Sequence, residues 1–268
     1  MTYGFIGAGV MGGAMIEGLI NGGTDPSDIV ACDKYLLKNI TDAYCVHGAD
    51  SVEALVGAAD IVFVVVKPKD CREVFERVAA CMNGVDKTVV SVVAGVTLAN
   101  IEKMLEKKIN VVRVMPNINA RFNESATAVC PGPHTGAGAA EAICKCLKIL
   151  GEVFMVDEEH FSVFTAIASC SPAFTYMYVD ALSRAATRLG VNKKLAEKIA
   201  AQAVAGSAKA LALSGKHPYE MVDAVCSPGG MTIEGVAELM ESGFAPSVMR
   251  AVEACVNKDR ALFGETAG

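Results

Sequence analysis

A glycine pattern near the N-terminus constrains the fold of this chain more than any other feature. The apolar segment Thr2 to Ile6 leads into Gly7-Ala8-Gly9-Val10-Met11-Gly12, after which apolar residues recur at helical spacing until Asn21. A G-x-G-x-x-G pattern between a strand and a helix is the context that the dinucleotide fingerprint requires. Its first glycine forms a tight turn, its second lets a pyrophosphate approach the backbone, and its third allows close helix packing. The pattern therefore predicts a dinucleotide-binding unit, and the simpler alternative is a tight strand–helix turn without a ligand.

The second predicted strand, Ile29 to Cys32, ends at two residues that bear on the choice of cofactor. Asp33 follows Gly12 by 21 positions, where an acid binds the ribose 2′-hydroxyl of NAD. Lys34 comes next and could meet the 2′-phosphate of NADP instead, or lie in solvent as an ordinary loop charge. Asp33 favours NAD and Lys34 favours NADP (as NADPH), so both cofactors stay open as alternatives.

Strand-like and helical segments alternate up to about residue 156. The continuous apolar run Ile61 to Val66 is typical of a central parallel strand, and it ends at Lys67-Pro68. Lys67 is predicted to contact the cofactor, the alternative being a solubilising strand end. Further strands are expected over 88–93, 109–114, 129–130 and 153–156. This alternation predicts an α/β fold with a doubly wound sheet, and a dinucleotide-binding domain over residues 1–156.

After Phe161 every predicted element is a helix. Ser171-Pro172 is expected to begin the first long helix as its N-cap and first residue. The Ala-rich helix Leu195 to Leu213 carries a face of small residues that is too apolar to be left in water. Burial of that face against a second copy predicts a homo-oligomer, and residues 157–268 are expected to form a helical dimerisation and substrate domain.

The composition argues against several classes of protein. The chain of 268 residues has a net charge of −6, and nothing in it supplies the basic stripe of a nucleic-acid binder. No apolar run approaches the ~18 residues of a membrane span, and the first residues lack the features of a signal peptide. Ten scattered cysteines without a C-x-x-C pair suggest reduced thiols in a cytoplasmic protein. We expect no metal site, because no histidine cluster accompanies the cysteines.

A second glycine-containing segment, Ser227-Pro228-Gly229-Gly230-Met231-Thr232, lies between two predicted helices. Pro228 fixes φ, and the two glycines leave the backbone amides without side-chain cover. Thr232 is expected to be the N-cap of the apolar helix Ile233 to Met240. Bare amides at a helix N-terminus can receive a small anion, whereas the simpler alternative is an ordinary connection.

These residues resemble those of a known family. The run Cys226 to Ile233, followed by Gly235-Val236 and Leu239-Met240-Glu241, is similar to the signature of the pyrroline-5-carboxylate reductases. Other matching segments occur in the same order as in that family, so the resemblance covers nearly the whole chain. They are Phe5 to Gly12, Val66-Lys67-Pro68, Ala94-Gly95-Val96 and Arg113-Val114-Met115-Pro116-Asn117.

The resemblance implies an oxidoreductase that reduces 1-pyrroline-5-carboxylate to L-proline with NADPH or NADH, the last step of proline biosynthesis. It implies an N-terminal Rossmann domain and a homodimer through the C-terminal helices, with larger rings such as a decamer of dimers. It further implies that Thr232 is the catalytic residue, with its hydroxyl bonded to the imine nitrogen. The implied substrate residues are Ser227, Gly229, Gly230, Met231 and Thr232. The implied cofactor residues are Gly7 to Gly12 for the pyrophosphate, and Val66, Lys67, Pro68, Ala94, Met115, Pro116 and Asn117 for the nicotinamide half.

The chain departs from the family pattern at two places. Ala168 to Ala173 lacks the glycines of the family's Ser-Gly-Ser-Gly-Pro-Ala run. Ile118-Asn119 stands where Thr-Pro is common, and Asn123 to Ala126 replaces a glycine-containing turn.

Two other functions remain as alternatives. A β-hydroxyacid dehydrogenase would share the N-terminal glycines, but it needs a lysine on the first C-terminal helix, and Phe174 to Leu189 contains none. The second alternative is a protein that senses NAD(P) without catalysis, because a fold alone does not establish activity.

Overall fold

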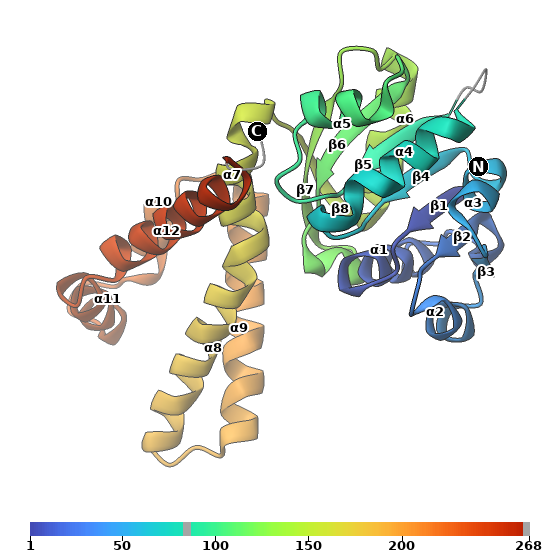
Figure 1. Cartoon of the computed structure of the whole chain (residues 1–268). Helices are drawn as coiled ribbons and strands as arrows, with labels where there is room; N and C mark the ends of the chain where they lie inside the picture. Colours follow the sequence, from blue (N-terminus) through green and yellow to red (C-terminus); the bar gives the residue numbers. More distant parts are fainter. Residues whose placement is uncertain (83–86, 265–268) are drawn as a thin grey trace. The chain divides into compact units, whose positions relative to one another are not determined.

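The computed structural model describes residues 1–82 and 87–264, with side chains described up to Ala261. Contacts divide the chain into two compact units (Figure 1). The first is Met1–Ser169 together with the C-terminal segment from Val256, and the second is Cys170–Cys255. The segment 157–169 therefore groups with the first unit by its contacts. The domain boundaries 1–156 and 157–268 remain predictions.

The first unit is built on an eight-stranded sheet, counted over the described residues, in the order β3-β2-β1-β4-β5-β6-β7-β8. All pairs are parallel except β6 with β7. Parallel pairing needs a long crossover, whereas only the short connection 116–124 joins β6 to β7. The doubly wound fold is confirmed. The strands are β1 Tyr3–Ile6, β2 Ile29–Cys32, β3 His47–Gly48, β4 Ile61–Val64, β5 Thr88–Ser91, β6 Asn110–Met115, β7 Ser125–Pro131 and β8 Gly151–Met155.

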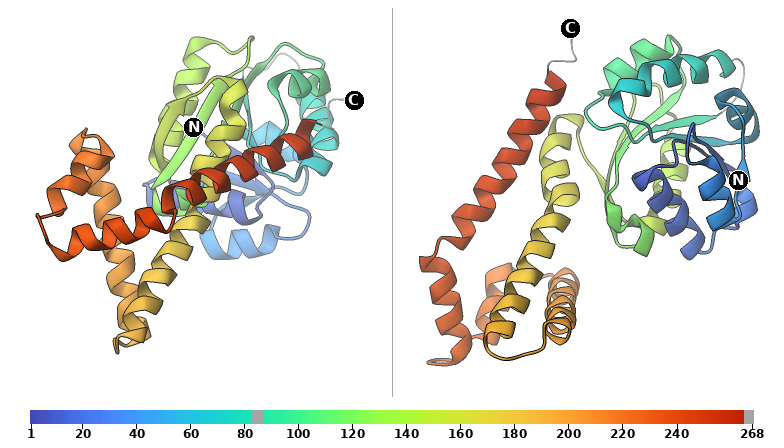
Figure 2. Two further views of the ribbon diagram at one scale, coloured as in Figure 1. Left: turned by 90° about the vertical axis from the view of Figure 1, so that its left-hand side faces the viewer. Right: turned by 60° about the horizontal axis from the view of Figure 1, so that its bottom comes forward.

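Helices cover both faces of this sheet, as the two turned views in Figure 2 show. On one face α1 and α6 pack over Phe5 and Phe63, whose rings stack 4.7 Å apart. On the other face α3, α4 and α5 pack over Val62 and Val89. Successive side chains of a strand point to opposite faces, so each central strand feeds both cores. The helices are α1 Val10–Asn21, α2 Leu37–Tyr44, α3 Val52–Ala58, α4 Cys71–Cys81, α5 Leu98–Leu105 and α6 Ala137–Leu147.

The chain turns helical after β8, but the first long helix does not begin where the sequence predicted. The 3-10 turn η5 (Glu158–His160), α7 (Phe161–Phe164) and a π-helical turn (Thr165–Cys170) run directly into α8 (Ser171–Arg188). Cys170 precedes α8 with helical angles (φ −90, ψ −34), so Ser171 is the first residue of the helix and not the N-cap that the sequence predicted. Pro172 has no N–H to give, and the preceding π turn already interrupts the usual hydrogen-bond ladder there.

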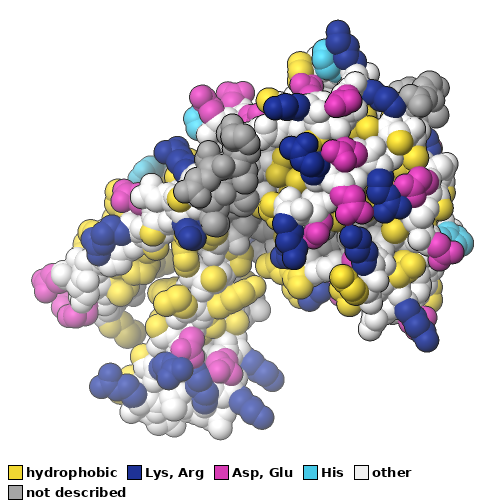
Figure 3. All heavy atoms as spheres, in the orientation of Figure 1, with side chains coloured by type: hydrophobic (Ala, Val, Ile, Leu, Met, Phe, Trp, Pro, Cys, Tyr) yellow, Lys and Arg dark blue, Asp and Glu magenta, His cyan; other side chains and the backbone are white. Residues whose placement is uncertain are grey.

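The second unit is an α-helical hairpin followed by two short helices and the first part of a long one, which continues into the segment from Val256. Lys193 Nζ donates to Asp180 Oδ1 (2.8 Å) and to the buried Ser183 hydroxyl (2.5 Å), which joins α8 to α9. Many large apolar side chains of this unit are exposed, including Tyr176, Met177 and Ile199, and Figure 3 shows hydrophobic side chains gathered on it. The remaining helices are α9 Lys193–Ser214, α10 Pro218–Val225, α11 Met231–Glu241 and α12 Phe244–Gly264.

Within the described residues, the model contains no helix that is both long and apolar enough to cross a membrane. The same residues hold no group of three or more His, Cys, Asp or Glu side chains arranged for a metal ion. All ten cysteines lie in the described part of the chain, and none of them forms a disulfide.

Candidate functional site

The three fingerprint glycines have different structural reasons to be glycine. Gly7 has a φ of +99, and a Cβ there would lie 2.5 Å from the carbonyl oxygen of Val65. A Cβ on Gly12 would lie 2.2 Å from the carbonyl oxygen of Gly7. A Cβ on Gly9, by contrast, would meet no atom within 4 Å. The neighbouring backbone therefore requires glycine at positions 7 and 12, whereas Gly9 borders open space.

That open space lies at the N-terminus of α1. The first hydrogen bond of the helix runs from Gly13 N to Gly9 O, at 2.7 Å. The amides of Val10, Met11 and Gly12 precede this bond, so the helix offers them no carbonyl partner. Gly9 is the N-cap and supplies no side-chain oxygen for them. These amides and the helix dipole together make the N-terminus of α1 suitable for binding a phosphate group.

Asp33, at the end of β2, holds the fingerprint loop by its side chain. Its Oδ2 accepts a hydrogen bond from Ala8 N at 2.8 Å, and its Oδ1 accepts from Tyr35 N at 2.8 Å and Leu36 N at 2.9 Å. Burial raises the pKa of the Asp33 carboxyl, but the three N–H donors outweigh burial, so the pKa lies below its usual range. Lys34 is exposed, and its Nζ lies 3.8 Å from Glu73 Oε2.

The other predicted cofactor residues follow the carboxyl ends of β4, β5 and β6. Because these strands are parallel to β1 and in register with it, their ends meet at the fingerprint edge of the sheet. The strand order reverses between β1 and β4, which is where ligands bind in open α/β sheets. Lys67 is exposed there, and Ala94 and Val66 are half-buried. The sheet thus brings together Gly7 to Gly12, Asp33, Val66 to Pro68, Ala94 and Met115 to Asn117.

Asn117 is buried and its side chain holds backbone segments. Its Nδ2 donates to Ala168 O at 2.9 Å, and its Oδ1 accepts from Asn119 N at 3.0 Å. Ser169 Oγ also donates to Pro116 O at 3.3 Å. The turn after β6 is therefore fixed to the π-helical turn. The sequence predicted Asp33 and Asn117 as cofactor residues. It did not predict the hydrogen bonds of their side chains, because the partners are main-chain groups, which no residue type identifies.

The turn Ser227 to Gly230 lies in the second unit and leads directly into α11. Gly230 N donates to Ser227 O at 3.0 Å, and Gly229 has a φ of +66. A Cβ on Gly230 would lie 2.3 Å from Ser227 Oγ, so a larger residue would displace the Ser227 hydroxyl.

The helix starts two residues earlier than expected, at Met231 instead of Ile233. Its N-cap is Gly230 (φ −81, ψ 167), so the expectation that Thr232 caps it is wrong. The turn closes at Gly230 and makes Thr232 the second residue of the helix. Met231, the first, is 92% exposed. The early amides of α11 have no carbonyl partner within the helix, so this end can receive an anion.

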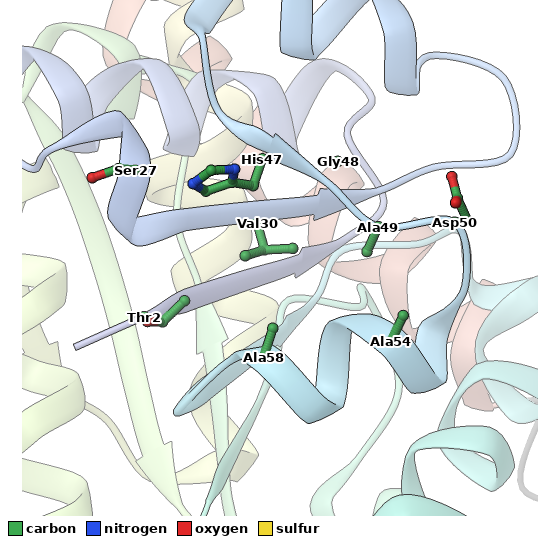
Figure 4. Close-up of a pocket in the computed structure, with 9 residues that line it drawn as sticks. All are labelled: Thr2, Ser27, Val30, His47, Gly48, Ala49, Asp50, Ala54 and Ala58. Carbon is green, nitrogen blue, oxygen red and sulfur yellow. The ribbon is translucent and has the colours of Figure 1, made fainter.

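The first unit also contains a hollow of about 520 Å³ (Figure 4). Thr2 and Ser27, on its border, precede β1 and β2, whereas the predicted cofactor residues follow their strands. Sequence analysis singled out none of its residues. They are Thr2, Ser27, Val30, His47, Gly48, Ala49, Asp50, Ala54 and Ala58.

Both parts of the chain match known families. A family model described as pyrroline-5-carboxylate reductase dimerisation matches residues 158–262. A model described as NADP oxidoreductase coenzyme F420-dependent matches residues 2–95. The pyrroline-5-carboxylate reductase of Escherichia coli (strain K12) is 34% identical, over 97% of this chain and 97% of that protein. The chain belongs to the pyrroline-5-carboxylate reductase family.

Other members of the family agree in length and fold. Pyrroline-5-carboxylate reductase 2 of Bacillus subtilis (strain 168) is 31% identical, over 99% of this chain and 96% of that protein. The solved reductase of Coxiella burnetii shares 28% identity at a TM-score of 0.89, covering 97% of this chain and 98% of that one. The Plasmodium falciparum pyrroline carboxylate reductase, solved with NADP bound, has the same fold, with a TM-score of 0.88, 24% identity and 98% of each chain covered.

These matches confirm the resemblance and the two-part fold of a Rossmann sheet followed by a helical region. The dimerisation model supports a homo-oligomer. The protein is an oxidoreductase that uses NAD(P).

Proposed function

We propose that this protein reduces the C=N bond of 1-pyrroline-5-carboxylate to L-proline with NAD(P)H, the last step of proline biosynthesis. The observation that carries the proposal is the Ser227–Thr232 turn, whose uncovered amides open α11 in a chain that aligns along its length with pyrroline-5-carboxylate reductases. A cyclic imino acid needs one anion site for its carboxylate and one donor for its nitrogen. The turn offers both within a few residues.

On this proposal the turn binds the substrate. The carboxylate accepts hydrogen bonds from the Ser227 hydroxyl and from the backbone amides of Gly229 and Met231, and it lies against Gly230, whose own amide closes the turn on Ser227 O. The Thr232 hydroxyl bonds the imine nitrogen and supports its conversion to an amine. Such a bond contributes about 1–3 kcal/mol, or roughly 10- to 100-fold in rate. Positioning of the reactants is the larger effect, at roughly 7–11 kcal/mol.

The cofactor residues divide into three groups. The α1 end from Gly7 to Gly12 holds the pyrophosphate, and Asp33 and Lys34 lie toward the adenosine ribose. Val66, Lys67, Pro68, Ala94, Met115, Pro116 and Asn117 border the nicotinamide half. When bound, the reduced nicotinamide supplies the hydride. The chain supplies orientation and a donor at nitrogen, so no histidine or carboxylate pair is needed.

The assembly and location are also proposals. We propose a homodimer through the C-terminal helices that can assemble further into a decamer of dimers. The exposed apolar side chains of the second unit support burial between copies. We propose a cytoplasmic location, which agrees with ten cysteines that form no disulfide.

The experiment is an assay of the purified protein with 1-pyrroline-5-carboxylate and either NADPH or NADH. We expect oxidation of the reduced cofactor and formation of proline. The absence of turnover with both cofactors would contradict the proposal. Cofactor binding without turnover would favour a sensing protein, and turnover of a β-hydroxyacid would favour a dehydrogenase.

A further inference from the structure

A buried arginine connects the cofactor edge of the sheet to the segment that follows it. Arg113, on β6, is 5% exposed. Its Nη1 donates to Glu158 Oε1 at 2.8 Å, and its guanidinium carbon lies 4.4 Å from the centroid of the Phe161 ring. Arg113 precedes Met115 by two residues on the strand that ends in the predicted nicotinamide turn.

Glu158 has a second partner that reaches another predicted cofactor loop. Its Oε1 also accepts a hydrogen bond from Leu98 N at 2.7 Å. Leu98 is the first residue of α5, and the loop Ala94 to Val96 lies directly before it. One carboxylate oxygen therefore fixes the end of this loop to Arg113 on the neighbouring strand.

Phe161 completes the connection through packing. It is fully buried in a small core cluster with Met115 and Ala128, and Ala94 packs against the same cluster. The Arg113 guanidinium lies over the same Phe161 ring. The arginine and the glutamate thus hold Ala94 and Met115 by two routes, one through the Leu98 amide and one through the Phe161 ring.

Stability alone is a weak reason for this ion pair. Removing a guanidinium from water costs free energy, and a buried pair often gains no more than an apolar replacement would. The Nε of Arg113 is moreover buried with no hydrogen-bond partner in the described part of the chain. The contacts that the pair does make are with the first residue of α5, which follows the Ala94 loop, and with Phe161, which packs against Met115.

We propose that Arg113 and Glu158 are positioning residues that hold the Ala94 loop and the Met115 turn in the geometry that receives the nicotinamide half of the cofactor. This inference rests on the proposed function for the placement of the nicotinamide. Neither side chain touches the cofactor. Their loss acts on the nicotinamide half and leaves the adenosine and pyrophosphate half, held at α1 and β2, unchanged.

The test compares binding of two probes to Glu158→Gln in the full-length protein. NADPH contains the nicotinamide, and 2′-phospho-ADP-ribose contains the rest of the molecule without it. We expect the Kd of NADPH and its KM to rise about tenfold, while the Kd of 2′-phospho-ADP-ribose changes less than about twofold. The matched control is Glu159→Gln, since Glu159 is the exposed neighbour and lies 3.9 Å from His160. It should match the wild type with both probes.

A second variant removes both charges, in case an unpaired buried arginine prevents folding. Arg113→Met with Glu158→Gln leaves no unpaired charge, so it should fold and show the same selective loss. An equal loss of affinity for both probes, or wild-type NADPH affinity in the double variant, overturns the proposal. Both probes report binding without substrate. A wild-type protein that binds NADPH but does not reduce pyrroline-5-carboxylate therefore refutes the proposed function and leaves this test intact.

Discussion

The carboxylate of Asp33 accepts a hydrogen bond of 2.8 Å from the amide of Ala8, and this bond joins the end of β2 to the middle of the fingerprint loop. Two further donors, Tyr35 N and Leu36 N, hold the other oxygen of the same carboxylate. Asp33 therefore shapes the loop on which the pyrophosphate is proposed to bind, whether or not it also meets the ribose. Substitution of Asp33 should reveal this role.

We predict that Asp33→Ala raises the KM of NADH and of NADPH together, because the Ala8 amide loses its partner and the loop loosens for either cofactor. The loss should be about tenfold or less, the size of one charge-assisted hydrogen bond. Steady-state kinetics with both cofactors provide the measurement. Asp42→Ala, on the exposed face of α2, is the control and should have no effect. A selective loss of NADH would instead identify Asp33 as a ribose-reading residue.

The lowered pKa of Asp33 has a consequence for stability. A carboxyl group with a depressed folded-state pKa contributes stability above its unfolded pKa and loses it as the pH falls through the folded value. We expect the stability difference between the wild type and Asp33→Asn to be present at neutral pH and to shrink in acid. Chemical unfolding across that range measures it. A difference that does not change with pH would contradict the assignment.

Gly9 offers a test of cofactor binding that leaves the fold unchanged. A Cβ there meets no atom within 4 Å, so Gly9→Ala should retain the melting temperature. The added methyl group lies where the pyrophosphate would approach, and we expect the Kd of NADPH to rise by about tenfold or more. Gly57→Ala, on α3, also enters open space and should leave binding unchanged. If Gly9→Ala binds NADPH normally, the phosphate does not approach the backbone at Gly9.

The sequence was sufficient where the signal is local. Gly7 was identified correctly as the residue of a tight turn and Gly12 as a close-packing position, because a glycine between a strand and a helix has few other uses. The antiparallel direction of β7 was not predicted, since apolar runs do not encode pairing direction. The N-caps predicted at Ser171 and Thr232 were wrong, because a π turn precedes the first and the Pro228-Gly229 turn places the second N-cap two residues earlier, at Gly230.

Long-range hydrogen bonds from side chains to the backbone could not be predicted from the sequence. Asn123 was noted only as a departure from a glycine-containing turn. In the structure it has a φ of +60, and its Nδ2 donates to Gly18 O and Ile149 O, both at 2.7 Å. Asparagine tolerates the left-handed conformation that glycine would adopt, and it adds two bonds that link the loop to α1.

We predict that Asn123→Gly lowers the free energy of unfolding by about 1–3 kcal/mol, because the backbone is still allowed but both hydrogen bonds are lost. Asn123→Ala should lose about 1 kcal/mol more, since alanine is strained at positive φ. Urea unfolding gives both values. Glu106→Gly is the control, because Glu106 is exposed with a φ of 51 and glycine there should be neutral or stabilising. Equal stability of Asn123→Gly and wild type would show that the two bonds contribute nothing.

Thr232 is the residue by which the proposed chemistry is most directly tested. As the second residue of α11 it is exposed and does not cap the helix, so Thr232→Ala should fold normally. We expect kcat to fall roughly 10- to 100-fold while the KM of the cofactor stays unchanged, because only the bond to the imine nitrogen is lost. Thr232→Ser keeps the hydroxyl and should remain close to the wild type. An alanine variant with wild-type kcat would exclude Thr232 from the reaction, and a serine variant as slow as alanine would assign its role to the methyl group instead.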